Sequence, residues 1–383
     1  VGLSTQLQVS RGEDELLKML DDCDDALVLL LNERAKAMEA LWQARGPEEG
    51  IPSAALSPMT IERLNNSNAA VGGPLPDSSI RNVFQEVSKV CCQMRHSVSY
   101  LGPPATFSHQ AARTRFGVNS CYVQCDRISD IFYHVEKGTT DYGVAPVENS
   151  TEGAVTQTLD LLANSDEDLE VVAEVCLDIQ HNLLSHADLH RIQRVFSHPQ
   201  ALAQCRNWLQ THVPGAAISS EASTARAAQI ASQASPEEGI AAVSSTLASE
   251  LYSIPIRAAG IQDLTSNMTR FVVIRRQNSE LPDQIPTKPS GDDKTMLVLN
   301  TADRVGALHD VLNTLQTKGI NLSRIESRPC KAKVWEYIFF VDMHGHRDEP
   351  HITAALDELK GHCSHIRVLG SFPFVRAASA KTA

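Results

Sequence analysis

The spacing of apolar residues changes at Val98, and this change constrains the fold more than any other feature of the chain. Before Val98, apolar residues recur at helical spacing. After it, short apolar runs of strand length alternate with helical segments. Such alternation is typical of an α/β sheet with helices on both faces. The sequence therefore predicts an all-helical N-terminal domain, residues 1–96, followed by an α/β domain, residues 97–276.

The N-terminal domain contains one long candidate helix. Ser10 and Glu13 form a possible capping box, and no glycine or proline follows until Gly46. The roughly 32 residues from the capping box to Gly46 would form a helix about 48 Å long, at about 1.5 Å per residue. A helix of this length needs partners along its whole apolar stripe, and a second subunit could supply them. The stripe consists of Leu16, Leu17, Leu20, Leu27, Leu30, Leu31, Met38 and Leu41.

Two shorter helices are expected after the long one. The first lies near Thr60–Leu64, and the second runs from Ile80 to Cys91 at helical spacing. The interval Asn65–Ser79 is predicted to be a loop because it contains Gly72-Gly73-Pro74 and Pro76.

The α/β domain is followed by a linker and by a third domain. The linker, residues 277–294, is rich in proline and acidic residues and poor in apolar ones. The third domain, residues 295–383, has the strand and helix order of an α+β ferredoxin-like unit. The predicted α/β strands include Val98–Leu101, Tyr142–Val147, Val171–Leu177, Val195–Ser197, Ile240–Val243 and Arg270–Ile274. The predicted elements of the third domain are strand Met296–Leu299, helix Gly306–Thr317, strands Leu322–Ser327 and Trp335–Val341, helix Pro350–Leu359 and strand Ile366–Leu369.

The amino-acid composition restricts the kinds of partner that the chain can bind and the cellular compartment in which it is expected. The formal net charge of −12 argues against nucleic acid and anionic membranes as partners, so an anionic substrate would need a local positive site. Nine scattered cysteines without a Cys-x-x-Cys pattern are typical of a reduced compartment. No apolar run approaches the roughly 18 residues of a membrane span, and no signal-peptide pattern precedes the long helix. We therefore expect a cytoplasmic protein.

Three polar segments at strand ends carry the candidate chemistry: residues 102–110, 146–153 and 267–271. Ligands bind at strand ends in open α/β sheets, and helix N-termini there can hold anions. Each segment also has a purely structural interpretation. Thr106 and Ser108 could only cap a helix, Asn149 and Ser150 could only turn the chain, and Thr269 could be an ordinary strand residue. The residues alone predict a small-anion-binding α/β protein.

These three segments, with Ser197-His198-Pro199-Gln200 and Ser223–Ala228, resemble the prephenate dehydratase family in order and spacing from Val98 to Arg276. The resemblance implies two α/β lobes like a type II periplasmic binding protein, with the site in the cleft. It implies a catalytic threonine at Thr269, a substrate-carboxylate ligand at Arg270 and an apolar wall at Phe271. Its remaining cleft residues map to Thr106, Ser108, Asn149 and Ser150. Ala105 departs from the glycine that many members carry.

The third domain resembles the ACT regulatory domains that bind phenylalanine. The resemblance rests on two motifs, Gly306-Ala307-Leu308-His309 and Glu326-Ser327-Arg328-Pro329. Taken alone, His309 could be an ordinary first-turn helix residue, and His344, His346 and His351 could form a metal site in a polar turn. The resemblance implies phenylalanine binding and no metal. An uncovered sheet face would favour pairing of ACT domains, and removing residues 290–383 should leave an active, phenylalanine-insensitive enzyme.

The N-terminal domain resembles the helical chorismate mutase fused to bacterial dehydratases, through Leu31-Asn32-Glu33-Arg34-Ala35. Arg34 matches a family active-site arginine, and Arg45 stands where the family usually has a catalytic lysine. Several other positions depart from the pattern: Leu17 beside Lys18, Ser57, Thr60 and Ile61, with Gln93 ambiguous. A structural dimer and an active mutase therefore both stay open.

The resemblances together imply an enzyme that converts prephenate to phenylpyruvate, CO2 and water and is regulated by phenylalanine. No cofactor and no metal are expected. The alternative is a bifunctional enzyme that also binds chorismate, and a rival from another class is a non-catalytic sensor with the same fold. The expected assembly is a homodimer or homotetramer.

Overall fold

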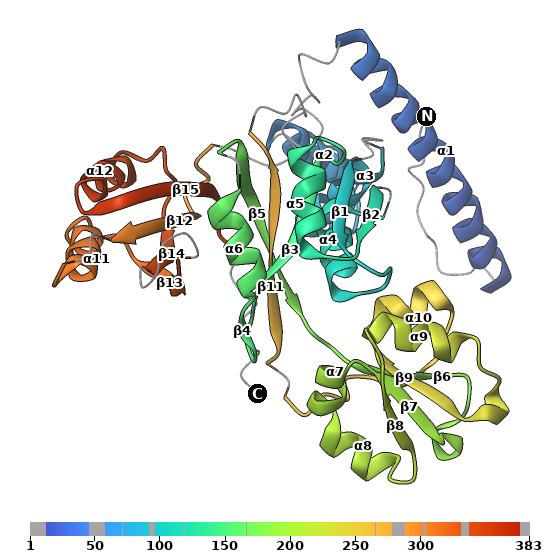
Figure 1. Ribbon diagram of the computed structural model, residues 1–383. Helices are drawn as coiled ribbons and strands as arrows, with labels where there is room; N and C mark the ends of the chain where they lie inside the picture. The colour runs from blue at the N-terminus through green and yellow to red at the C-terminus, as the bar shows by residue number, and fades with distance from the viewer. Residues whose placement is uncertain are drawn as a thin grey trace. The chain divides into compact units, whose positions relative to one another are not determined.

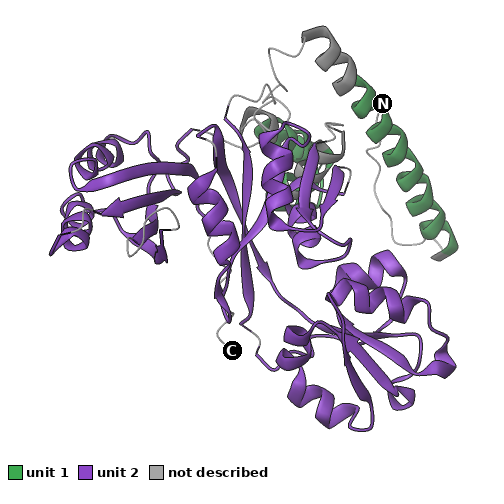
Figure 2. Ribbon diagram, viewed as in Figure 1, with its two compact units in different colours: residues 1–95, 280–284 green, residues 96–279, 285–383 purple. Residues whose placement is uncertain are grey.

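The computed structural model describes residues 13–45, 58–70, 72–91, 96–118, 120–165, 167–264, 266–277, 288–301, 304–330 and 337–375 (Figure 1). The chain divides into two compact units. Unit 1 is residues 1–95 with 280–284, and unit 2 is residues 96–279 with 285–383 (Figure 2). Within the described ranges, no helix combines the length and apolar character needed to cross a membrane.

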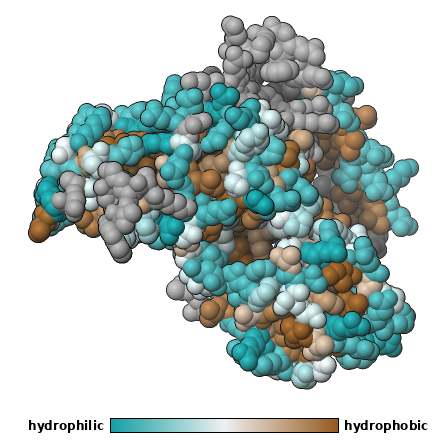
Figure 3. All heavy atoms as spheres, in the orientation of Figure 1, coloured by the Kyte–Doolittle hydropathy of each residue, from teal (hydrophilic) through white to brown (hydrophobic). Residues whose placement is uncertain are grey.

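Unit 1 contains the helices α1 (Glu13–Arg45), α2 (Pro58–Ala70) and α3 (Asp77–Cys91). The long predicted helix is present. The loop predicted to begin at Asn65 is wrong in its first part, because α2 continues to Ala70. Asparagine, serine and alanine tolerate a helix, and the first strong breaker is Gly72. Many apolar side chains of α1 are exposed, among them Leu20, Leu27 and Leu30, and Figure 3 shows apolar surface along this helix.

Unit 2 begins with a lobe built on a sheet in the order β2-β1-β3-β11-β5, with β4 paired to β3. Strand β11 lies antiparallel between β3 and β5, although it comes last in sequence. The strands are β1 (Ser97–Leu101), β2 (Cys121–Cys125), β3 (Tyr142–Asn149), β4 (Gly153–Ala154), β5 (Leu169–Asp178) and β11 (Met268–Arg276). The helices are α4 (Phe107–Phe116), α5 (Ile128–Glu136) and α6 (Thr156–Asn164).

The second lobe is built on a sheet in the order β10-β6-β9-β7-β8. The chain enters this lobe after β5 and returns to the first lobe at β11 (Figure 1). Its strands are β6 (Asn182–Ser185), β7 (Arg194–Ser197), β8 (Ala217–Ser220), β9 (Ile240–Ser244) and β10 (Ile256–Ala258). Its helices are α7 (Pro199–Gln204), α8 (Arg206–His212), α9 (Thr224–Ser232), α10 (Thr246–Tyr252) and the short 3-10 turns Leu189–Arg191 and Pro236–Glu238.

The C-terminal part of unit 2 is a four-stranded sheet in the order β13-β14-β12-β15. Its strands are β12 (Asp293–Thr301), β13 (Leu322–Pro329), β14 (Tyr337–His344) and β15 (Cys363–Pro373). Its helices are α11 (Ala307–Thr317) and α12 (Pro350–Leu359). The predicted strand start at Trp335 lies outside the described residues. Strand β12 begins at Asp293, earlier than the predicted Met296 and inside the predicted linker, because a buried lysine, Lys294, continues the ladder.

The two faces of this sheet are covered differently. Leu297, Leu299 and Val341 pack against α11 and α12. On the other face, Val298 and Phe340 join the core of the first lobe, which includes Leu159, Leu162 and Val171. The expectation of an uncovered sheet face is therefore not met, because the first lobe of the same chain covers it.

Candidate active site

A cavity of about 280 Å³ is lined by residues of both lobes and of the strand ends that join them. The first lobe contributes Leu101, Gly102, Thr106, Phe107, Ser108 and Asn149. The second lobe and the connections between the lobes contribute Ile179, His181, His198, Gln200, Ala201, Gln204, Ala222, Ser223, Thr224, Asn267 and Thr269. Four of the predicted site residues, Thr106, Ser108, Asn149 and Thr269, therefore come together in one cavity.

Thr269 and Asn149 are cross-strand neighbours at the ends of β11 and β3. The backbone N–H groups of Thr151 and Glu152 donate to Asn149 Oδ1 at 3.0 and 3.1 Å, so this oxygen is identified as the acceptor end of the amide. Asn149 Nδ2 must then donate, and it lies 2.8 Å from Thr269 Oγ1. Because the Thr269 oxygen already accepts this bond, its own proton is left for another acceptor in the cavity.

Further hydrogen bonds connect Asn149 to the second lobe, and the donor and acceptor of each can be assigned. Asn149 Nδ2 also donates to Asn267 Oδ1 at 2.9 Å, so Asn267 Nδ2 donates to Gln204 Oε1 at 3.1 Å. Gln204 Oε1 must therefore accept from His181 Nε2, which is 2.9 Å away. Burial lowers the pKa of His181, although the bond to Gln204 opposes this shift. His181 is thus connected to the Thr269 hydroxyl by hydrogen bonds whose donors and acceptors are all assigned.

Two helix N-termini contribute to the cavity. Thr106 is the N-cap of α4 and accepts from His109 N, and Ser223 is the N-cap of α9 and accepts from Arg226 N. First-turn N–H groups lack partners inside a helix and attract anions. Thr106 thus does cap a helix, as its structural interpretation held, and it also lines the cavity. Ala105 has a φ of 70°, a conformation that glycine adopts more easily, which accounts for the glycine that many family members carry there.

Three predicted site residues do not line the cavity. Ser150 Oγ instead accepts from Met268 N and donates to Ser266 O, so it fastens β3 to the start of β11. Phe271 is buried in the sheet at 2% exposure rather than forming a wall of the cavity. Arg270 lies next to Thr269 on a strand, where successive side chains point to opposite faces of a sheet.

Arg270 contacts carboxylates on the side of the sheet away from the cavity. Its guanidinium lies 2.5 Å from Asp342, 3.6 Å from Glu148 and 3.7 Å from Glu174. Burial alone would lower the pKa of Arg270, but these carboxylates outweigh burial and raise it. No lysine or arginine is among the described residues that line the cavity, so an anion bound there would be held by helix N-termini and hydroxyls.

Sequence reasoning missed His181, Gln204 and Asn267 as site residues. A signal was available for two of them. Asn267 opens the segment that contains Thr269, and Gln204 follows Ser197-His198-Pro199-Gln200 on the next helical turn. His181 follows β5 in an otherwise ordinary stretch, and only the fold brings it to the cavity.

Of the two phenylalanine motifs, one begins helix α11 and the other ends strand β13 of the C-terminal sheet. Gly306 is the N-cap of α11 with a φ of 81°, followed by Ala307, Leu308 and the exposed His309. Glu326 to Pro329 end β13, one of the two edge strands of the sheet. Strand β14 separates β12 from β13. Arg328 of the second motif donates to Asp160 of α6 at 3.2 Å and so touches the first lobe.

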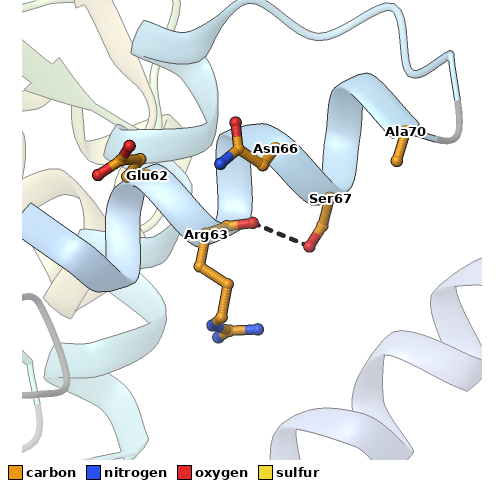
Figure 4. Close-up of a pocket in the computed structure, with 5 residues that line it drawn as sticks. All are labelled: Glu62, Arg63, Asn66, Ser67 and Ala70. Carbon is orange, nitrogen blue, oxygen red and sulfur yellow. Dashed lines mark hydrogen bonds between the residues drawn. The ribbon is translucent and has the colours of Figure 1, made fainter.

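In unit 1, Arg34 is half-buried on α1, whereas the side chain of Arg45 lies outside the described residues. Ser57 and Gln93 also lie outside them, as do the side chains of Thr60 and Ile61. Directly after Ile61, a surface hollow on α2 is lined by Glu62, Arg63, Asn66, Ser67 and Ala70 (Figure 4). All five belong to one helix, so the hollow is a shallow feature of the surface of α2. Across the described ranges of both units, no group of three metal-binding side chains occurs.

Comparison with known proteins agrees with this architecture. A family model described as "Prephenate dehydratase" matches residues 98–279, and one described as "ACT domain" matches residues 295–361. The bifunctional chorismate mutase/prephenate dehydratase of Aquifex aeolicus is 38% identical over 371 residues, which cover 94% of this chain and 97% of the relative.

Two solved structures are similar over 73% of this chain, each with a TM-score of 0.64. One is the prephenate dehydratase of Arthrobacter aurescens in complex with L-Phe, 31% identical and covered over 93% of its length. The other is GqqA, described as a quorum-quenching acylase, 28% identical and covered over 98%. The predicted fold is confirmed, with a helical N-terminal part, two periplasmic-binding-protein-like lobes and an ACT domain. This chain belongs to the prephenate dehydratase family.

Proposed function

We propose that this chain is a prephenate dehydratase of phenylalanine biosynthesis, which converts prephenate to phenylpyruvate, CO2 and water under the control of phenylalanine. The observation that carries this proposal is the cavity in which Thr269 and Asn149 meet, inside the segment that matches the family. GqqA shows that the fold alone does not decide the activity, so the proposal depends on the site. Incubating the purified chain with prephenate and measuring phenylpyruvate tests it directly.

The reaction couples two bond breakages. The electron pair of the ring carbon–carboxylate bond enters the ring as CO2 departs, and the ring hydroxyl leaves with its bonding pair and takes up a proton to become water. Aromatisation drives both steps. The enzyme must hydrogen-bond or protonate the departing hydroxyl. The proton of Thr269, left free by the bond from Asn149, is placed for this task.

The same cavity can hold the substrate dianion without a cationic side chain. The N-termini of α4 and α9 offer N–H groups to the side-chain carboxylate. The ring carboxylate loses CO2 more readily where water is excluded, and Phe107 and Ile179 supply apolar contact. In this proposal Thr106, Ser108, Asn149 and Thr269 are catalytic or binding residues, and Ser150, Arg270 and Phe271 support them from outside the cavity.

Replacing Asn149 with aspartate should lower kcat for prephenate by about 10-fold or more, less than the roughly 100-fold of fully lost acid–base assistance because the Thr269 hydroxyl remains. An aspartate cannot donate to Thr269 Oγ1, so the threonine proton would turn toward the new carboxylate instead of the substrate. The measurement is steady-state kinetics on the Asn149→Asp variant, with circular dichroism to verify folding. Wild-type kcat in a folded variant would show that the orientation of Thr269 is unimportant.

The position of the two ACT motifs supports regulation by phenylalanine. The N–H groups that follow Gly306 can hold an amino acid's carboxylate. Glu326 to Pro329 end an edge strand that does not adjoin β12, so a partner chain could close the pocket. Tyrosine should act more weakly than phenylalanine, because its hydroxyl would need a buried partner.

Phenylalanine should bind the wild-type chain and inhibit it, and Gly306→Val should abolish both effects. Valine strongly disfavours a φ of 81°, so the turn that presents the N–H groups would be lost. Titration calorimetry measures binding, and phenylpyruvate formation measures inhibition. Gly319→Ala is a suitable control, because Gly319 also has a positive φ in this domain but lies at the other end of α11. Neither binding nor inhibition at millimolar phenylalanine would refute the sensor assignment.

A second candidate activity is chorismate mutase, favoured by the match of a bifunctional relative over 94% of this chain. Arg34 and Arg45 would be its cationic residues. The departures at Leu17, Thr60 and Ile61 favour a structural dimer instead. Consumption of chorismate by the purified chain decides between them.

The exposed apolar stripe of α1 leads to a prediction about assembly. Leu20, Leu27 and Leu30 are between 55% and 67% exposed, too much for a stable solitary helix surface. The segment 1–96 should therefore sediment as a dimer, with weak or absent mutase activity. Leu27→Glu should shift it toward monomer, whereas Lys36→Glu, on an already exposed polar position, should not. A well-folded wild-type monomer, or efficient chorismate consumption, would contradict this prediction.

A further inference from the structure

Six charged side chains form one cluster where the ACT sheet meets the first lobe. Three are basic and three acidic, so their formal charges balance. All except Glu148 have side chains no more than 13% exposed. The residues of this junction cluster are Glu148 (β3), Glu174 (β5), Arg270 (β11), Lys294 (β12), Arg324 (β13) and Asp342 (β14).

The junction cluster is continuous from one domain to the other. Arg270 of the first lobe lies 2.5 Å from Asp342 of the ACT sheet. Arg270 and Arg324 both approach the same oxygen of Glu148, at 3.6 and 3.2 Å. Lys294 Nζ donates to both oxygens of Glu174 at 2.9 Å. Separating a buried charge from its partner is strongly destabilising. The residues of such a cluster are therefore expected to move together, with their ion pairs intact.

On the catalytic side, the junction cluster is one residue from the reaction site on two adjacent strands. Arg270 follows Thr269 on β11, and Glu148 precedes Asn149 on β3. The strand register pairs Thr269 with Asn149 and Arg270 with Glu148. The hydrogen bond that orients the Thr269 hydroxyl and the Arg270–Glu148 ion pair therefore join adjacent residues of the same two strands, β3 and β11.

On the regulatory side, the junction cluster includes the strand that carries the second phenylalanine motif. Arg324 is two residues before Glu326 on β13, on the same face of the strand. Arg328, within the motif, reaches Asp160 of α6. A ligand that shifts β13 must therefore move both arginines against the first lobe or break their ion pairs.

We propose that Arg270 and Glu148 are positioning residues that keep Thr269 and Asn149 in register, and that the junction cluster transmits displacement of β13 to them. The inference rests on the proposed function. It replaces the role of substrate-carboxylate ligand for Arg270, because Arg270 does not line the cavity. Phenylalanine would inhibit by favouring the arrangement of β13 in which the Thr269 hydroxyl is poorly oriented.

The first experiment is the kinetics of Arg270→Lys with prephenate. Lysine keeps the charge but cannot hold several carboxylates in fixed geometry. A positioning role predicts a fall in kcat of about 10-fold with KM within about 2-fold, because an interaction acting through Thr269 changes the chemical step rather than substrate binding. A carboxylate ligand predicts the opposite split, with KM raised and kcat largely kept, and that result would overturn the positioning role.

The second experiment separates phenylalanine binding from inhibition. Asp342→Asn removes the ACT carboxylate nearest Arg270 without changing shape. Calorimetry should show phenylalanine affinity within about 3-fold of wild type, whereas the activity remaining at saturating phenylalanine should rise about 10-fold or more above that of wild type, the scale of a typical allosteric coupling. If Asp342→Asn does not fold, Glu148→Gln tests the same cluster from its most exposed member.

The matched control is Arg347→Gln. Arg347 pairs with Glu170 at 3.4 Å across the same domain junction but belongs to no pair with the junction cluster. This variant should keep wild-type inhibition. Equal loss of inhibition in the control and in Asp342→Asn would overturn the proposal, as would unchanged inhibition in Asp342→Asn. A wild-type chain that forms no phenylpyruvate contradicts the proposed function itself, and one that is active but not inhibited contradicts the coupling.

Discussion

Thr269→Ala is expected to lower kcat for prephenate by about 100-fold or more, the scale of lost acid–base assistance. The variant removes the only hydroxyl in the Asn149–Thr269 pair, whereas the strand ladder that holds residue 269 stays intact. Thermal stability should change little, because Thr269 is only half-buried and its hydrogen bond faces the cavity. Stopped assays of phenylpyruvate on the purified variant give kcat directly.

Thr269→Ser is the control for this prediction. Serine keeps a hydroxyl at the same position and can still accept from Asn149, so it should recover most of the lost activity. Near-wild-type turnover in the alanine variant would remove Thr269 from the mechanism. If serine were as poor as alanine, the methyl group rather than the hydroxyl would be the part that matters.

Removing residues 290–383 is expected to abolish the response to phenylalanine and also to destabilise the remaining enzyme by about 4 kcal/mol. The second effect was not expected from the sequence. The ACT sheet covers Leu159, Leu162, Leu169 and Val171 of the first lobe. If each loses about half of the roughly 2 kcal/mol gained on full burial, the sum is about 4 kcal/mol. Urea unfolding of the truncated and full chains measures the difference.

Removing the ACT domain exposes charged side chains of the first lobe, and one of them provides a control for the truncation. Glu174 loses Lys294 as its partner and is left against Arg270 alone. Glu174→Gln should therefore be destabilising in the full chain but should cost less in the truncated one. Equal stability of the two wild-type forms would mean that the ACT sheet does not cover this core in solution.

The division into three parts could be predicted from the sequence because the spacing of apolar residues predicts a different order of helices and strands in each part. Strands such as β3 are predictable because they are largely buried and appear in the sequence as apolar runs. Strand β8 could not be found in this way. It lies at the edge of its sheet and is largely exposed, so its residues carry no strong pattern.

The site could be predicted only in part, for a reason that Arg270 illustrates. Sequence places Thr269, Arg270 and Phe271 together, but a strand directs successive side chains to opposite faces, and only the register with β3 shows which face meets the cavity. His181 presents the converse case. It is distant in sequence from Thr269, and hydrogen bonds through three intervening amides, those of Gln204, Asn267 and Asn149, connect the two residues.

The place of β11 in its sheet has a consequence for synthesis on the ribosome. This strand fills the gap between β3 and β5, yet the whole second lobe is translated between β5 and β11. Until Arg276 has emerged, β3 and β5 each present an unpaired edge that can bind other chains. The second lobe, in contrast, closes its own sheet by Ala258. The nascent chain should therefore complete its middle before its first lobe, and chaperones that shield open strand edges should act on it during that interval.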